Sequence, residues 1–185
     1  MNSRWFNQPF SQAFPIAHFM RRAFPEYWLR IHSLPESKRY PENEAERQIV
    51  FDRSARFGSA LLGQSAPCII IQSRIVGFPR DSEIMPNFDW KPIHRIGDAN
   101  PDQELDDEIW NSWMAHTVWE PNVFRSLLLQ IADDKKAHIA FLSEQTDCVF
   151  IPYDGGSDGF SFDSILLRRL AVEFAPWRSA SPLGL

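Results

Sequence analysis

A group of basic and polar side chains in the first third of the chain has the composition of an anion-binding site. Its members are Arg30, His32, Lys38, Arg39, Tyr40 and Arg47. Arginine binds phosphate or carboxylate through two parallel hydrogen bonds, and lysine adds a point charge. Two outcomes are open. Either these side chains converge on an anionic ligand, or they pair with Glu36, Glu42, Glu44 and the acids of a later turn, and so only fix the loop.

The later turn carries two carboxylates among three glycines, in the sequence DGGSDG from Asp154 to Gly159. It superficially matches the start of a calcium-binding loop. However, Gly156 stands where the third position needs an acid or amide, and Ile165 stands where the twelfth needs a glutamate. Glycine tolerates positive φ, and aspartate caps backbone N–H groups. We therefore expect a structural turn over 154–159, and we keep Asp154 and Asp158 as candidate ligand-binding residues.

The histidines and cysteines do not form a recognisable metal or nucleophile motif. None of the five histidines is spaced with Cys, Asp or Glu as a metal site requires. Cys68 and Cys148 lie in apolar runs, which raise rather than lower a thiol pKa. Walker loops and G-x-G-x-x-G loops are absent. We predict no metal, no cofactor and no catalytic residue, which argues against an enzyme without excluding one.

A second candidate site is an acidic run followed by tryptophans. Residues 98–108 read DANPDQELDDE, with six acids. This run is either a solvated loop or a docking surface for a protein with a basic surface. In the second interpretation the contact residues are Asp106, Asp107, Glu108, Trp110 and Trp113. Seven tryptophans and fifteen phenylalanines are many for this length, and we expect the surplus to line a groove or a partner-binding face.

Composition limits the class of protein. A chain of 185 residues fits a single domain over 1–185, with a loop-rich segment at 76–108 where four prolines interrupt the pattern. The net charge is −5 and the basic residues are dispersed, which argues against nucleic acid as a partner. The sequence lacks an apolar window of membrane-spanning length and a signal-peptide core. Together with two thiols expected to be buried, this predicts a cytoplasmic protein.

The hydrophobic patterns predict an α+β domain. Its expected architecture is a mixed, mainly antiparallel sheet of about five or six strands, with helices packed chiefly on one face. The segment 109–119 is expected to be a strand, with a helix as the alternative. Helices are expected at 11–24, 41–62, 120–133 and 163–175. Strands are expected at 27–33, 68–71, 88–96, 137–143, 148–153 and 160–162, with Pro92 placing 88–96 at an edge.

Three stretches are together similar to an uncharacterised bacterial family of domains of unknown function. They are LRIHSLPESKRYPENEAE from Leu29 to Glu46, the PYDGG-x-D turn from Pro152 to Asp158, and the tail WRSASPLGL from Trp177 to Leu185. The tail departs from the family pattern, with Arg178 where a leucine is expected and Ser181 in place of a histidine. The resemblance implies a grouping and no activity.

We predict a protein-interaction module of unknown partner, for example an immunity or antitoxin-like protein that masks a basic toxin. A homo-oligomer is a further possibility. The alternative function is a protein that binds a small anionic ligand, or a hydrolase, using Arg30, His32, Arg39 and Asp154. The two hypotheses need different surfaces. A ligand site needs a pocket in which the cationic side chains converge, whereas a binder can present a flat acidic and aromatic face.

Overall fold

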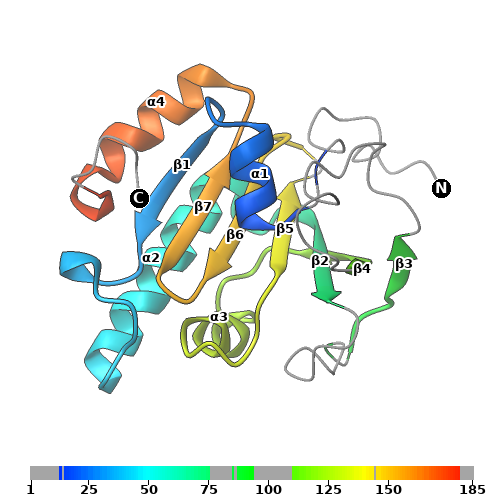
Figure 1. The fold of residues 1–185 in the computed structure, drawn as a ribbon, viewed down its shortest axis with the longest axis horizontal. Helices are drawn as coiled ribbons and strands as arrows, with labels where there is room; N and C mark the ends of the chain where they lie inside the picture. Colours follow the sequence, from blue (N-terminus) through cyan, green and yellow to red (C-terminus); the bar gives the residue numbers. More distant parts are fainter. Residues whose placement is uncertain are drawn as a thin grey trace.

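A computed structural model describes residues 13, 15–75, 85, 87–93, 110–143 and 145–179 of the chain. Within these residues, seven strands form one sheet in the order β1-β7-β6-β5-β2-β4-β3 (Figure 1). The strands are β1 (Trp28–His32), β2 (Pro67–Ile75), β3 (Lys91–Ile93), β4 (Trp110–Val118), β5 (Ile139–Ser143), β6 (Val149–Tyr153) and β7 (Gly156–Phe160). The α-helices are α1 (Ala17–Ala23), α2 (Glu44–Leu62), α3 (Arg125–Ala132) and α4 (Ser164–Glu173).

The predicted α+β class is confirmed, with two differences in the sheet. Every pairing between the described strands is antiparallel, so this part of the sheet is not mixed. The seven described strands exceed the expected five or six. The segment 109–119 provides strand β4, because Trp110 to Val118 pairs along its whole length with β2. Strand β3 lies at the edge of the described sheet, where a proline, which has no N–H to donate, is tolerated.

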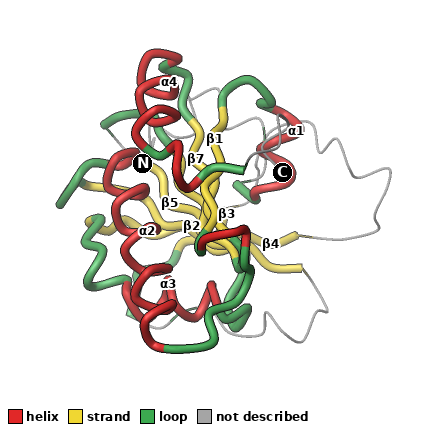
Figure 2. Tube along the Cα trace, turned by 90° about the vertical axis from the view of Figure 1, so that its left-hand side faces the viewer, coloured by secondary structure: helices red, strands yellow, loops and turns green. Residues whose placement is uncertain are grey.

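The described helices lie on both faces of the sheet. Helices α2, α3 and α4 cover one face, and α1 lies on the other (Figure 2). The larger core lies under α2 and α3 and centres on Trp119, which is fully buried. Its indole lies 4.9 Å from the Phe141 ring and 5.3 Å from the Phe150 ring. A smaller core lies under α1 and includes Met20 and Phe160. These aromatic residues therefore fill the interior rather than an open groove.

The expected turn at 154–159 is shorter in the structure, and this corrects the prediction. Only Asp154 and Gly155 form the turn, and β7 already begins at Gly156 instead of Phe160. Asp158 therefore lies in the middle of a buried strand, directly opposite Arg30 of β1. The reason is packing: a Cβ on Gly159 would lie 2.5 Å from Leu61 Cδ1 and 2.8 Å from Phe57 Cζ of α2. Glycine is needed here for close approach of a helix, not for a turn.

We expect Gly159→Ala to lower the free energy of unfolding by about 1 to 3 kcal/mol, because the added methyl overpacks the contact between β7 and α2. Gly155→Ala is the matched control. A Cβ there would meet Arg39 Cγ at 3.4 Å, an ordinary contact, so its effect should stay below about 0.5 kcal/mol. Urea unfolding of both variants measures the difference. Equal effects would show that the two segments do not pack as described.

Candidate functional site

A pocket of about 300 Å³ opens beside α1, on the face of the sheet that this helix covers. Its walls are α1, the loop between α3 and β5, and the end of β6 with the turn that follows. The apolar part of the lining comprises Ile16, Ala17, Ala137, Ile151 and Pro152. The polar part comprises His18, Arg21, Arg39, Asp134, Lys135, Lys136, His138, Tyr153 and Asp154. Four cationic side chains thus face two carboxylates, in a chain whose net charge is −5.

Beneath one wall lies a buried carboxylate shared by two arginines. Asp158 is completely buried and accepts hydrogen bonds from Arg21 of α1 and, at 3.3 Å, from Nε of Arg30. The Arg30 guanidinium lies between two rings, 5.5 Å from that of Trp28 and 5.2 Å from that of Tyr153. Burial raises the pKa of the Asp158 carboxyl, and the two guanidinium groups oppose that rise. One negative charge therefore holds two positive groups in place.

Tyr153 connects this buried group to the pocket. Burial raises the pKa of its phenol well above the usual value, and the nearby Asp158 carboxylate adds to the rise. The phenol consequently keeps its proton at neutral pH, which argues against a role as a base or nucleophile. The Tyr153 ring also contacts the Arg30 guanidinium. The position of Tyr153 in the pocket wall therefore depends on the arginine that pairs with Asp158.

An ion pair between Arg39 and Asp154 forms the pocket rim on the side of the β6–β7 turn. Arg39 directs Nε and Nη2 at one oxygen of Asp154, each at 2.6 Å, and the hydroxyl of Tyr40 donates to the same oxygen at 3.0 Å. This hydrogen bond to Asp154 raises the pKa of Tyr40. The Arg39 side chain is 64% exposed, so the rim is open to solvent.

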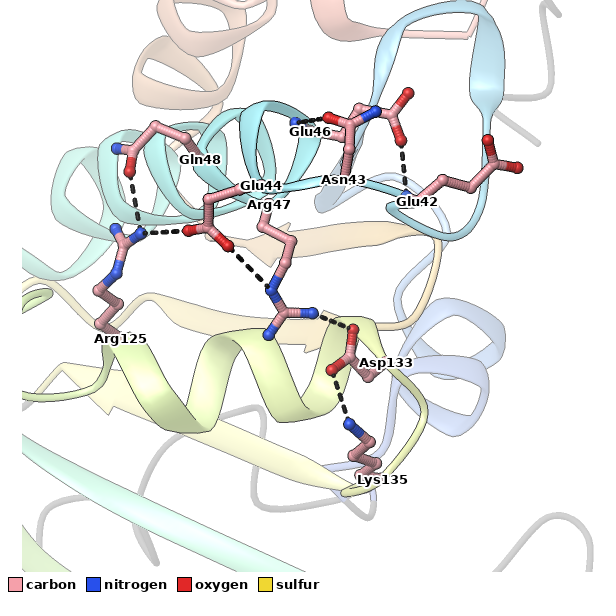
Figure 3. Close-up of polar contacts among 9 residues, drawn as sticks. All are labelled: Glu42, Asn43, Glu44, Glu46, Arg47, Gln48, Arg125, Asp133 and Lys135. Atoms are coloured by element: carbon pink, nitrogen blue, oxygen red, sulfur yellow. Dashed lines mark hydrogen bonds and ion pairs between the residues drawn. The ribbon is translucent and has the colours of Figure 1, made fainter.

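A polar network between α2 and the end of α3 lies next to the pocket (Figure 3). Asp133 accepts from Arg47 at 2.6 Å and from Lys135 at 3.1 Å. Arg47 also lies 3.8 Å from Glu44, which lies 3.7 Å from Arg125. For Asp133, burial favours a higher pKa, but the hydrogen bonds from Lys135 and Arg47 reverse this and hold the pKa below its usual value. The network anchors the loop that carries Lys135 and Lys136.

That loop also contains two residues in a left-handed backbone conformation. Asp134 and His138 both have φ of 57°. Helix α3 ends in a Schellman motif, in which the N–H of Lys135 donates to Gln130 O at 2.8 Å and the N–H of Asp134 to Ile131 O at 3.0 Å. Glycine is the usual residue at the position of Asp134. An aspartate there costs conformational energy, because a residue with a Cβ is strained in the left-handed region.

The predicted cationic cluster does not converge on one point. Arg39, Tyr40 and Asp154 meet at the pocket rim, whereas Arg30 pairs with Asp158. Arg47 pairs with Asp133. Arg30 and Asp154, which the hydrolase hypothesis combined, therefore pair with different residues.

Lys38 and His32 lie apart from that rim. Lys38 lies 2.8 Å from both oxygens of Glu46 and 3.0 Å from Glu42, which is the loop-fixing role that the sequence also allowed. His32 contacts Ser37 at 3.3 Å, and its pKa is lowered by burial and then by Arg30 and Arg53. A histidine kept neutral in this way adds no charge to an anion site.

The predicted partner surface is placed only in part. Asp106, Asp107 and Glu108 lie outside the described residues. Trp110 and Trp113 are half-buried, with the Trp110 ring 6.0 Å from Phe19 and 4.9 Å from His138. The Arg74 guanidinium lies 5.7 Å from the Trp113 ring. Both tryptophans therefore make contacts within the chain.

Four charged pocket residues were missed in the sequence: Arg21, Asp134, Lys135 and Lys136. The signal available for three of them is the charged run DDKK at 133–136, placed between a helix and a strand. Arg21 gave no such signal, because it is one of two adjacent arginines on a short helix.

Searches for other chemical features among the described residues gave three results. Cys68 and Cys148 are both buried, as predicted. In the described ranges, His, Cys, Asp and Glu do not gather in groups of three that would hold a metal ion. The helices found in those ranges are all too short or too polar to span a membrane.

Comparison with known proteins gives one match. A family model for a domain of unknown function matches residues 16–182, nearly the whole chain. Curated proteins and solved structures gave no match.

We expect Asp158→Asn to lower the free energy of unfolding by about 3 to 5 kcal/mol, because it leaves Arg21 and Arg30 without their shared counter-charge. Asp154→Asn is the control: its partner Arg39 is exposed, and the loss should be under about 1 kcal/mol. Urea unfolding at neutral pH distinguishes the two. If both variants lost the same small amount, Asp158 would not hold α1 to the sheet.

We expect Asp134→Gly to raise the free energy of unfolding by about 0.5 to 1 kcal/mol, because glycine adopts the left-handed conformation without a Cβ penalty. Asp147→Gly is the matched control, since Asp147 has φ of 51° in an exposed turn away from the pocket. Thermal unfolding should show a gain in both variants. A loss in Asp134→Gly alone would mean that interactions of this carboxylate outweigh its backbone cost.

Proposed function

The chain belongs to the DUF3885 family of domains of unknown function, and we propose that it binds a small anionic ligand in the pocket beside α1. One observation carries this proposal: four cationic side chains, from Arg21, Arg39, Lys135 and Lys136, surround a pocket that contains two carboxylates, in a protein with a net charge of −5. A locally positive concave site in an acidic protein attracts small anions selectively over the rest of the surface.

The four cations come from three separate parts of the chain. Arg21 is on α1, Arg39 precedes α2, and Lys135 and Lys136 follow α3. Bringing like charges together costs electrostatic energy, which in the described structure is offset by Asp158, Asp154 and Asp133. These ion pairs orient the cations before any ligand arrives, and such preorganisation lowers the entropic cost of binding.

The side chains in the pocket support binding rather than hydrolysis. The Tyr153 phenol keeps its proton. Cys148, whose pKa is raised by burial, lies in the core under α2 and α3 and does not line the pocket. Arg30 and Asp154, which the hydrolase hypothesis combined, pair with different residues. A ligand-binding protein needs only the charge and the concave shape.

The protein-interaction hypothesis stays a prediction. Its acidic run at 98–108 lies outside the described residues, so an immunity or antitoxin-like role with a basic partner rests on the sequence alone. A bacterial origin rests on the family resemblance. Cytoplasmic localisation is likewise proposed, with support from the burial of both cysteine side chains.

We expect inorganic phosphate to raise the Tm of the protein at constant ionic strength, by about 5 to 10 °C at 100 times its Kd. The double variant Lys135→Gln, Lys136→Gln should show a much smaller rise, because the anion loses two counter-charges. Differential scanning calorimetry measures both.

The control is Arg168→Gln, which removes one charge from the exposed face of α4, where the Arg168 guanidinium lies 3.5 Å from the Ser164 hydroxyl. This variant should keep the full rise in Tm. If the double variant kept it too, phosphate would be acting through general salt effects, and the pocket would not be an anion site.

A further inference from the structure

We infer that the ligand is a phosphate monoester of a small organic molecule, held as its dianion with the ester group against the apolar wall. This inference rests on the proposed function and specifies its ligand. It follows from the balance of charges around the pocket and from the division of the lining into a cationic part and an apolar part.

The charge balance around the pocket leaves an excess of positive charge at two places. Arg21 and Arg30 share the single carboxylate of Asp158. At the other wall Lys135 and Arg47 share Asp133, and Arg47 and Arg125 share the exposed Glu44. Each group thus contains one more cation than carboxylate. The other charged lining residues, Arg39, Lys136, Asp134 and Asp154, add no net charge. A ligand with two negative charges neutralises both groups, whereas a carboxylate or sulfate ester supplies one charge.

The donor geometry at the buried group also fits a phosphoryl group. Arg21 lines the pocket while its Nη1 is bonded to Asp158. A guanidinium carries five N–H donors in a planar fork, so the remaining donors can bind an oxygen of the ligand. Asp158 holds the Arg21 guanidinium in place, because this carboxylate is fully buried and water does not compete for the hydrogen bond between them. Three terminal oxygens of a phosphate ester can then meet Arg21 and the two lysines from different directions.

The remaining lining favours an organic group over free phosphate. Ile16, Ala17, Ile151 and Pro152 present apolar surface, and Tyr153 also lines the pocket. A volume of about 300 Å³ exceeds what a phosphate group alone fills and lies at the lower end of small-molecule sites. Burying the organic part against this wall adds a hydrophobic contribution that inorganic phosphate lacks.

The test compares phenyl phosphate with phenyl sulfate, which has nearly the same shape and one negative charge fewer. Isothermal titration calorimetry at about pH 7.5 keeps the phosphate ester mainly dianionic, because its second pKa is about 6. We expect phenyl phosphate to bind about 10-fold more tightly than phenyl sulfate and than inorganic phosphate. In the double variant Lys135→Gln, Lys136→Gln the preference over phenyl sulfate should fall toward one, while Arg168→Gln should retain it.

The outcomes separate the two proposals. If phenyl sulfate binds as tightly as phenyl phosphate, and the double variant weakens both, anion binding stands and the dianion inference is overturned. If inorganic phosphate binds as tightly as phenyl phosphate, the organic group is not recognised and the ligand is free phosphate. If none of the three probes binds, or if the double variant binds all of them normally, the proposed function itself fails.

Discussion

The buried carboxylate of Asp158 is the constraint on which the rest of this face of the molecule depends. A fully buried charge is tolerated only when it is paired, and here it is paired with Arg21 and Arg30 at once. Arg21 belongs to α1, the helix described on this face, so the ion pair holds that helix against the sheet. Arg30 in turn fixes the rings of Trp28 and Tyr153. The pocket opens next to this helix and is lined by residues of α1 and of the end of β6.

The opposite face of the sheet is built from apolar contacts instead. The rings around Trp119 fill the space under α2 and α3, and Gly159 lets α2 approach β7 closely. The two faces meet in β7, where Gly159 serves the apolar core and Asp158, one residue earlier, serves the polar group. Because neighbouring side chains in a strand point to opposite faces, one short segment can satisfy both requirements. This explains a strand that contains only one large apolar residue, Phe160.

The fold class and most element positions could be predicted from the sequence because hydrophobic periodicity is a local property. Leu29 and Ile31 alternate with polar residues and are buried, as a half-buried strand requires. Asp163 caps α4 by accepting from the N–H groups of Ile165 and Leu166. The site was predicted less well. The types of Arg39, Tyr40 and Asp154 indicated an anion-related group, but which carboxylate each cation contacts depends on strand pairing between segments more than a hundred residues apart.

The sequence by itself therefore determined the α+β class, the family, the burial of both cysteines and the abundance of cations that an anion site needs. Only the tertiary structure decided that Asp158 lies in a strand and not in a turn, because the requirement for glycine came from α2 packing on β7 and not from local backbone conformation. It also decided which cations gather. Arg21 and Lys136 are distant in sequence and share no motif. They line one pocket because the fold brings α1 and the loop after α3 to the same end of β6.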